Sequence, residues 1–187
     1  GEAGQIYARV PGIPDGTNRQ HADEVTYVSI GDGATSEGEF WESLNTACTQ
    51  PVPVLYLVED NGYAISVPVD AQTPGGSISK LVENFPNLKV LRCDGTDYFD
   101  SYRTIDEAVQ WIRRERKPAL VHATVTRPYS HSLSDDERLY KTPEEREAEA
   151  ARDPILKLRT HLLARGLATE AELLELATLR AAPALRA

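Results

Sequence analysis

Four apolar runs, separated by stretches with helical spacing, constrain the fold of this 187-residue chain more than any other feature. They occupy residues 25–30, 52–59, 89–94 and 119–125. The runs lack the regular apolar–polar alternation of strands with one face in water, so each is interpreted as a strand covered on both faces. Strands of this kind that alternate with helices form parallel sheets. The sequence therefore predicts an α/β fold in which helices cover both faces of a parallel sheet.

Helices are predicted between these strands from capping residues and apolar spacing. Ser36 and Glu39 have the spacing of a capping box and precede apolar residues at helical intervals. Thr104 and Glu107 have the same spacing ahead of a second helical pattern. Residues 77–85 predict a short helix. Each helix falls between two strands along the chain, as the crossovers of a parallel sheet require.

The character of the chain changes after residue 126. A polar, acid-rich stretch without apolar periodicity predicts a long surface loop that runs into an exposed helix. Asp153 and Pro154 then suit the cap and first position of a helix that ends at Gly166. Thr169 and Glu172 begin another helix. These elements predict a helical C-terminal extension of the α/β core.

These patterns divide the chain into four parts. They are an irregular N-terminal segment over 1–24, an α/β core over 25–126, a loop with an exposed helix over 127–152, and C-terminal helices over 153–187. The chain contains no methionine, so its numbering does not begin at an initiator. It opens on a polar segment that leads directly into a strand. We expect it to be a piece of a longer polypeptide.

Charge and composition argue against several classes of function. The formal net charge of −9, with no basic stripe to offset it, argues against general nucleic-acid binding. The longest apolar run, "VPVLYLV", is far shorter than a membrane span, and no signal peptide opens the chain. Cys48 and Cys93 form no metal-type cluster and are interpreted as buried, reduced thiols. We expect a cytoplasmic protein.

An aspartate between two glycines, in "GDGATSEGEF", follows the first predicted strand. Glycines before a helix normally admit a phosphate, but Asp32 has the wrong charge for direct contact. The dinucleotide fingerprint needs a glycine where Ser36 stands, and a P-loop needs a lysine where Glu39 stands. A divalent cation between carboxylate and phosphate resolves the conflict, and magnesium suits that role. The alternative is a helix N-terminal acid that satisfies backbone amides.

A second ligand is expected at the end of the second strand, in "EDNGYAIS". Asn61 offers an amide oxygen, and the glycine after it permits a turn that points the Tyr63 carbonyl inward. Between Gly33 and Asp60 lie 26 residues, which is one helix plus one strand. Asp32 and Asn61 therefore return to the same edge of the sheet, where parallel α/β folds bind their ligands.

These motifs carry a resemblance to a known family. "GDG" followed at this distance by a sequence close to an asparagine pair is similar to the thiamine diphosphate-binding motif. With "YSHSLSDD" after the fourth strand, the motifs resemble the alpha chain of the thiamine-dependent decarboxylating component of 2-oxoacid dehydrogenase complexes. The likeness is to the branched-chain and pyruvate types, including bacterial forms in which alpha and beta parts are fused. It extends from about residue 24 to about residue 176 and implies the thiamine diphosphate-binding fold.

The resemblance implies a role for each motif residue. Asp32, Asn61 and the Tyr63 carbonyl would hold Mg²⁺, which in turn holds the cofactor diphosphate. The other implied contacts are those of Gly33 and Ala34 with the diphosphate, of Ile65 with the cofactor, and of His131 as the active-site histidine. Asp60 replaces the first asparagine of the family's pair. We expect the change to be tolerated, because the family's ligand is the second position.

For the remaining polar residues, an ordinary structural role is weighed against a functional one. His131 alone would be an ordinary loop histidine, and its flanks and place after the fourth strand favour a functional role. His21, His122 and His161 receive no role, since they lie in the opening turns, in a strand and on a helix. The acidic run over 135–149 is interpreted as a solvated face.

The resemblance also implies a reaction and its partners. The reaction is the oxidative decarboxylation of a 2-oxo acid, with acyl transfer to the lipoyl domain of a transacylase component. A beta subunit, or a beta half of the same polypeptide, would complete the active site, so the isolated chain is expected to be inactive. One alternative is another thiamine enzyme, such as an acetoin dehydrogenase or a transketolase. The other is a non-catalytic assembly module that retains the fold.

Overall fold

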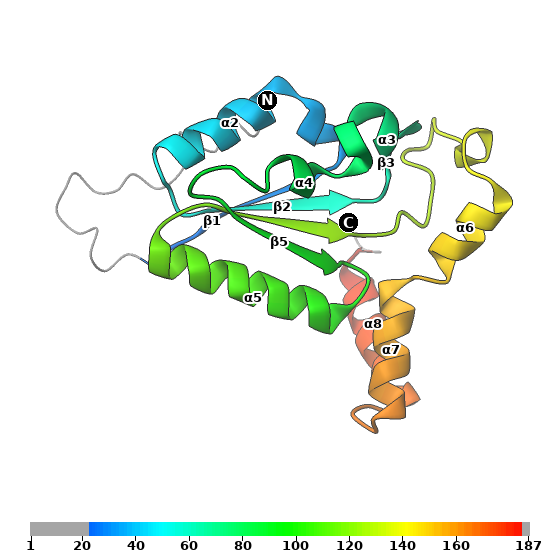
Figure 1. Ribbon diagram of the computed structural model, residues 1–187. Helices are drawn as coiled ribbons and strands as arrows, with labels where there is room; N and C mark the ends of the chain where they lie inside the picture. Colours follow the sequence, from blue (N-terminus) through cyan, green and yellow to red (C-terminus); the bar gives the residue numbers. More distant parts are fainter. Residues whose placement is uncertain (1–22, 185–187) are drawn as a thin grey trace.

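A four-stranded parallel sheet lies at the centre of the computed structural model, which describes residues 23–184 (Figure 1). Its strands are β1 (Thr26–Gly31), β2 (Val54–Asp60), β5 (Lys89–Asp94) and β6 (Ala119–Thr124). They are arranged in the order β1-β2-β6-β5, and every neighbouring pair is parallel. The predicted parallel sheet is confirmed, and each strand begins and ends close to its expected bounds. The expectation that each strand is covered on both faces is wrong for the edge strand β1, where Tyr27 is 56% exposed.

Helices cover both faces of the sheet, as predicted. They are α2 (Gly38–Thr49) and the short α4 (Ile78–Leu81) on one face, and α5 (Tyr98–Glu115) on the other (Figure 1). Ala108 and Ile112 of α5 pack with Leu55 and Val121 of the two central strands. The apolar stripe expected for this helix is therefore the face that covers the sheet.

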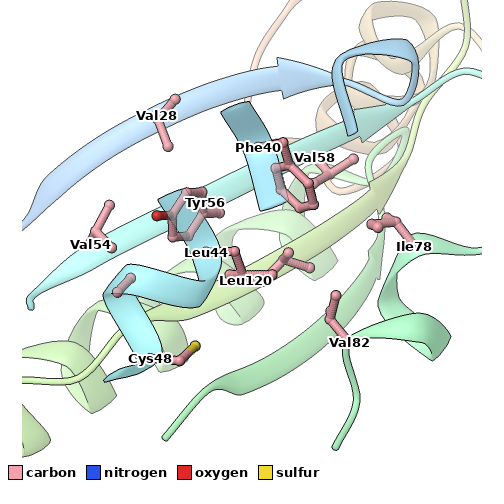
Figure 2. Close-up of a cluster of buried hydrophobic side chains, with 11 residues drawn as sticks. Val28, Phe40, Leu44, Cys48, Val54, Tyr56, Val58, Ile78, Val82 and Leu120 are labelled. Carbon is pink, nitrogen blue, oxygen red and sulfur yellow. The ribbon is translucent and has the colours of Figure 1, made fainter. Parts of the chain in front are cut away.

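The core under α2 is the larger of the two. Phe40 and Leu44 project from α2 toward Tyr56 and Val58 of β2, and Ile78 reaches the same cluster from α4 (Figure 2). The rings of Phe40 and Tyr56 meet edge to face, with their centroids 6.3 Å apart. Burying a large apolar side chain contributes about 1.5–3 kcal/mol. This layer therefore holds the crossover between β1 and β2 against the sheet.

The predicted capping box of Ser36 with Glu39 is wrong. Gly33–Ser36 forms a 3-10 helix, η1, and α2 begins only at Gly38. Ser36 therefore precedes the helix, and its hydroxyl donates to the Gln72 carbonyl at 3.4 Å. The tight turn of η1 directly after β1 moves the start of α2 beyond the reach of Ser36.

The second predicted capping box, Thr104 with Glu107, is also wrong. Helix α5 begins at Tyr98, and Thr104 is buried inside it. The Asp97 carboxylate accepts hydrogen bonds from the backbone N–H groups of the second and third helical residues, both at 2.9 Å. These are two of the amides that a helix start leaves unpaired, so Asp97 determines where α5 begins.

A small hairpin follows β2 at the carboxyl edge of the sheet, and the sequence did not predict it. The elements there are β3 (Tyr63–Ala64), β4 (Val67–Pro68), α3 (Val69–Gln72) and η2 (Pro74–Gly76). Strands β3 and β4 are antiparallel and form a separate two-stranded sheet. The hairpin and α3 lie beside η1 (Figure 1), so the segments after β1 and β2 meet.

The C-terminal part is helical, as predicted. Its elements are η3 (Glu137–Leu139), α6 (Pro143–Ala150), α7 (Pro154–Ala164) and α8 (Glu170–Ala184). The Asp153 carboxylate accepts hydrogen bonds from the first amides of α7, with Pro154 at the first position. Thr169 and Glu172 exchange hydrogen bonds at 2.8 and 3.3 Å, which confirms the capping box ahead of α8.

Two further observations bear on the sequence predictions. Cys48 and Cys93 are both free thiols, Cys48 buried and Cys93 half-buried. Within residues 23–184, no helix combines the length and the apolar character that crossing a membrane requires. The irregular segment expected over 1–24 lies almost entirely outside the described residues.

Candidate cofactor-binding site

Asp32 lies directly after β1, at the carboxyl edge of the sheet. Only 2% of the residue is exposed. Its side chain makes no capping hydrogen bond to η1. The side-chain amide of Gln72 in α3 donates instead to Asp32 Oδ2 at 2.6 Å. The carboxylate is thus turned toward the segment that follows β2.

Burial raises the pKa of Asp32, and the neighbouring charge of Asp60 raises it further. Hydrogen bonds from its own backbone N–H, from the Gln72 amide and from the Asn61 backbone N–H act in the opposite direction. Burial and a like charge both disfavour the ionised form, and a bound cation reverses that balance. Asp32 therefore has the electrostatic setting of a metal ligand.

A tight turn follows β2 and contains the second predicted motif. Gly62 has a φ of +83°, which glycine adopts without strain. The Tyr63 N–H donates to Asn61 Oδ1 at 3.1 Å, and the Val69 N–H donates to the Gly62 carbonyl at 2.8 Å. Tyr63 and Pro68 form a non-hydrogen-bonded pair of the hairpin, so the Tyr63 carbonyl points away from β4. The turn therefore offers amide and carbonyl oxygens, both of which are hard-cation ligands.

The two residues expected to contact a diphosphate, Gly33 and Ala34, lie in η1. A Cβ atom on Gly33 would lie 2.8 Å from the Cβ of Ala64 in β3, so only glycine allows this approach. Ile65, at the tip of the hairpin, has a φ of +57° and is 52% exposed. The structure therefore brings η1 against the hairpin, and the hairpin tip presents an apolar side chain.

His131 lies on the exposed loop after β6. Its backbone N–H donates to Asp135 Oδ2 at 2.8 Å. Among residues 23–178, no hydrogen bond or ion pair joins the His131 ring to Asp32 or Asn61. The structure brings the other predicted site residues together at one edge and leaves His131 on a separate loop.

Arg127 connects that loop to the hairpin. Its Nη1 donates to the Ile65 carbonyl at 2.8 Å, and its Nη2 donates to the Tyr140 hydroxyl at 2.7 Å. Tyr140 in turn donates to Asp135 Oδ2 at 2.6 Å. Because Asp135 also accepts from the His131 backbone, this chain of contacts sets where the loop lies relative to the hairpin.

The acidic run over 135–149 is not simply a solvated face. Lys141 is buried, and its ammonium donates to Glu149 and lies 3.7 Å from Glu137. The same ammonium lies 5.2 Å from the centre of the Tyr63 ring. A buried charge must be paired, so two of these acids face inward. The interpretation as a solvated face is therefore wrong for Glu137 and Glu149, which pair with the buried lysine.

A buried pair behind the turn was missed by sequence reasoning. Asp60 Oδ2 and His122 Nε2 lie 2.8 Å apart, and both residues are buried. His122 had received no role, since a lone histidine within a strand gives no indication of its partner. The one available signal was position: both polar residues stand near the carboxyl ends of strands that prove to be neighbours.

The fold and this edge define a class of protein: a parallel α/β protein with a buried carboxylate, an amide and a carbonyl gathered where such folds bind ligands. Comparison with known proteins narrows the class. The family described as "Dehydrogenase E1 component" matches residues 3–180. The chain therefore belongs to the dehydrogenase E1 component family, whose members depend on thiamine diphosphate.

Individual relatives agree with this assignment. The chain is 35% identical over 167 residues to the 3-methyl-2-oxobutanoate dehydrogenase subunit alpha of Mycobacterium tuberculosis, covering 83% of the chain and 45% of that protein. It is 31% identical to the 2-oxoisovalerate dehydrogenase subunit alpha of Bacillus subtilis, covering 85% of the chain and 48% of that protein. It is 29% identical to a pyruvate dehydrogenase E1 component subunit alpha of Rickettsia bellii, covering 94% of the chain and 54% of that protein. The chain spans about half the length of the curated relatives it matches.

Proposed function

We propose that this chain is the cofactor-binding part of the decarboxylating component of a 2-oxoacid dehydrogenase complex. In the complete protein it takes part in the oxidative decarboxylation of a 2-oxo acid and in acyl transfer to a lipoyl group. The observation that carries the proposal is the meeting of buried Asp32 with the turn at Asn61 and Tyr63. The family match and the names of the relatives support it.

The residues fit thiamine diphosphate held through Mg²⁺. Asp32, Asn61 Oδ1 and the Tyr63 carbonyl supply three oxygen ligands, and Mg²⁺ completes its octahedron with phosphate and water oxygens. The buried Asp32 carboxylate with its raised pKa and the Tyr63 carbonyl, which points away from β4, support this set. The remaining contacts are those of Gly33 and Ala34 with the diphosphate and of Ile65 with the body of the cofactor.

Bound thiamine diphosphate supplies a carbon nucleophile and an electron sink for the decarboxylation. The residues of this chain hold and orient it. His131, on the loop after β6, would act as a proton donor or acceptor in the assembled enzyme. Arg127 supports this arrangement, because it hydrogen-bonds both the hairpin that presents Ile65 and the Tyr140 side chain that anchors the His131 loop.

The proposed partners follow from the same assignment. A beta subunit, or a beta half of the same polypeptide, covers the cofactor from the other side and completes the active site. The lipoyl domain of a transacylase component accepts the acyl group. The relatives are named as alpha subunits, which supports a two-part enzyme. A cytoplasmic location accompanies this function.

The 2-oxo acid is identified by direct comparison of substrates. The names of the relatives point to 3-methyl-2-oxobutanoate and to pyruvate. Decarboxylation rates of the assembled enzyme with these two acids, and with acetoin as the competing substrate class, separate the candidates. A preference for acetoin over both acids would contradict the proposal.

The metal assignment is tested with Asp32→Ala in the full-length protein. We expect Mg²⁺-dependent thiamine diphosphate binding to be lost, because the only carboxylate of the proposed ligand set is removed, while the protein remains folded. Calorimetric titration measures the affinity, and thermal unfolding checks the fold. Asp70→Ala is the matched control, since Asp70 is an exposed acid in the neighbouring α3. Unchanged affinity in Asp32→Ala would contradict the metal site.

A further inference from the structure

Polar side chains cross the sheet in a row at its carboxyl end, where the apolar core under α2 and α4 stops. Asp60 of β2 meets His122 of β6 at 2.8 Å. His122 is in register with Arg92 of β5. Ser79 of α4 lies over the row, with its hydroxyl 2.8 Å from His122 Nδ1 and 2.7 Å from Arg92 Nε. Four residues from four elements thus form one continuous chain of hydrogen bonds.

The groups at the two ends determine the direction of the hydrogen bonds. An arginine only donates, so the Ser79 hydroxyl accepts from Arg92 Nε. The Ser79 hydroxyl, which also lies 3.2 Å from Ser77 Oγ, can then donate to His122 Nδ1. His122 Nε2 donates to Asp60, since an ionised carboxylate only accepts. Asp60, His122 and Ser79 are all buried, and each has a partner. A buried network with all partners present rigidifies its surroundings.

Both carboxylate oxygens of Asp60 are used. Oδ2 accepts from His122, and Oδ1 accepts from the Gly62 backbone N–H at 2.8 Å. Gly62 stands between Asn61 and Tyr63, the two proposed ligands of the turn. Asp60 therefore joins the core of the sheet to this turn, and rotating its carboxylate toward the cofactor would break both contacts.

A freely rotating Asp60 carboxylate would disturb the proposed metal site. Its charge already raises the pKa of Asp32. A second carboxylate free to enter the site would repel the first or compete with Asn61 for the cation. Mg²⁺ demands a near-octahedral set of ligands at short distances, so a misplaced oxygen is poorly tolerated.

We propose that His122, held by Ser79 and Arg92, is a positioning residue: it keeps Asp60 turned away from the metal and bonded to Gly62, so that neutral Asn61 and the Tyr63 carbonyl serve as ligands. This role rests on the proposed function. It also accounts for an aspartate at the position where the family motif has an asparagine.

The test uses the full-length protein and measures Mg²⁺ affinity calorimetrically at saturating thiamine diphosphate. His122→Leu removes the donor to Asp60 Oδ2 and lets the carboxylate turn. We expect Mg²⁺ affinity to fall about 10- to 100-fold, the range typical of residues that orient metal ligands. Ser79→Ala removes the hydrogen bonds to His122 and Arg92 but leaves the contact between His122 and Asp60, so Mg²⁺ affinity should fall only about two- to tenfold.

Asp60→Asn separates positioning from a merely structural role. The asparagine retains an oxygen for the Gly62 N–H and carries no charge, so the Mg²⁺ affinity should stay close to that of the wild type. In the double variant His122→Leu/Asp60→Asn, no carboxylate is left to enter the site. We expect the double variant to recover most of the Mg²⁺ affinity that His122→Leu loses, although it is no more stable than His122→Leu.

Leu120→Ala is the matched control, since Leu120 is a buried residue on the same face of the same strand. It should lower the unfolding temperature without changing the Mg²⁺ affinity of the folded protein. Thermal unfolding without metal and cofactor provides this comparison for all variants. If His122→Leu does not fold, Ser79→Ala and Asp60→Asn decide the question.

Two results would overturn the positioning role. One is wild-type Mg²⁺ affinity in both His122→Leu and Ser79→Ala. The other is a loss in Asp60→Asn as large as that in Asp32→Ala, which would make Asp60 a metal ligand itself. If the wild-type protein shows no Mg²⁺-dependent thiamine diphosphate binding, the proposed function fails, and the positioning role fails with it.

Discussion

At the scale of single residues, Gly33 lies so close to the hairpin that a larger residue does not fit there. A methyl group on Gly33 would lie 2.8 Å from Ala64 Cβ. Gly33→Ala must therefore push η1 and β3 apart. We expect it to lower the free energy of unfolding by about 1–3 kcal/mol, as overpacking does, and to weaken thiamine diphosphate binding.

Gly38→Ala is the control for this substitution, because nothing lies within 4 Å of the added methyl group. Alanine also suits the first position of α2 better than glycine does. Denaturant unfolding and calorimetric titration of the full-length variants measure both effects. Equal stability and equal affinity of the two variants would show that η1 and the hairpin separate without cost.

His131 is the second residue for which we predict the effect of a substitution. His131→Ala should leave folding and Mg²⁺ binding nearly unchanged, since an exposed loop residue contributes little to the core. The reaction of the assembled enzyme should slow by about 10²–10⁴-fold if proton exchange is lost. Rates with an artificial electron acceptor and with a lipoyl substrate measure the effect. His161→Ala on α7 serves as the control, and wild-type rates in His131→Ala would make it an ordinary loop histidine.

At the scale of elements, the loop over 126–141 depends on its anchor to the hairpin. The loop is polar and exposed, so limited proteolysis of the protein without cofactor should begin there. Arg127→Ala removes the hydrogen bonds to Ile65 and Tyr140. Two hydrogen bonds of ordinary strength correspond to roughly a tenfold or greater increase in the open population. We therefore expect cleavage within the loop to accelerate by about tenfold.

The matched control for this experiment is Arg138→Ala. Arg138 is exposed and hydrogen-bonds Asp136, which is two residues away in the same loop. Its removal should leave the rate of loop cleavage near the wild-type value. The unfolding temperature should be nearly the same for both variants, since neither side chain lies in the core. Equal cleavage rates would mean that Arg127 does not hold the loop.

At the scale of the whole molecule, the core under α2 makes stability sensitive to alkaline pH. Burial raises the pKa of the Cys48 thiol from 9.0 to about 11 and, despite a hydrogen bond with Ser43, that of Tyr56 to about 12. Between pH 9 and 11 the unfolded chain loses the thiol proton while the folded protein keeps it. Unfolding is then favoured, so stability falls as pH rises through this window and is unaffected below it.

Urea unfolding between pH 8 and 11.5 checks this expectation, which requires no cofactor. Cys48→Ala removes the ionisable group, so its free energy of unfolding should fall less steeply than that of the wild type between about pH 9 and 11. The difference at pH 8, where the thiol is protonated in both states, reports the packing cost alone. Parallel curves for the two proteins would exclude Cys48 as the cause.

Local patterns predicted the strands well, but they placed only two of the four capped helix starts correctly, those of α7 and α8. The strands follow from continuous apolar runs, which are typical of parallel sheets, although only the central strands β2 and β6 are largely buried on both faces. A capping box is a spacing of two residue types, and the same spacing occurs inside helices. Thr104 and Glu107 both lie within α5, whose actual cap is Asp97. The spacing alone did not show which backbone N–H groups would be left unpaired at the start of the helix.

The sequence by itself determined the parallel sheet, the edge at which Asp32 and Asn61 meet, and the family resemblance, since these depend on local composition and on distances along the chain. Tertiary structure alone decided the pairs Asp60–His122 and Arg127–Ile65, each of which joins residues 62 positions apart. A hydrogen bond forms only when donor and acceptor lie within about 3 Å. That placement follows from the order and register of β2 and β6 and from the path of the loop, which residue types along the chain do not specify.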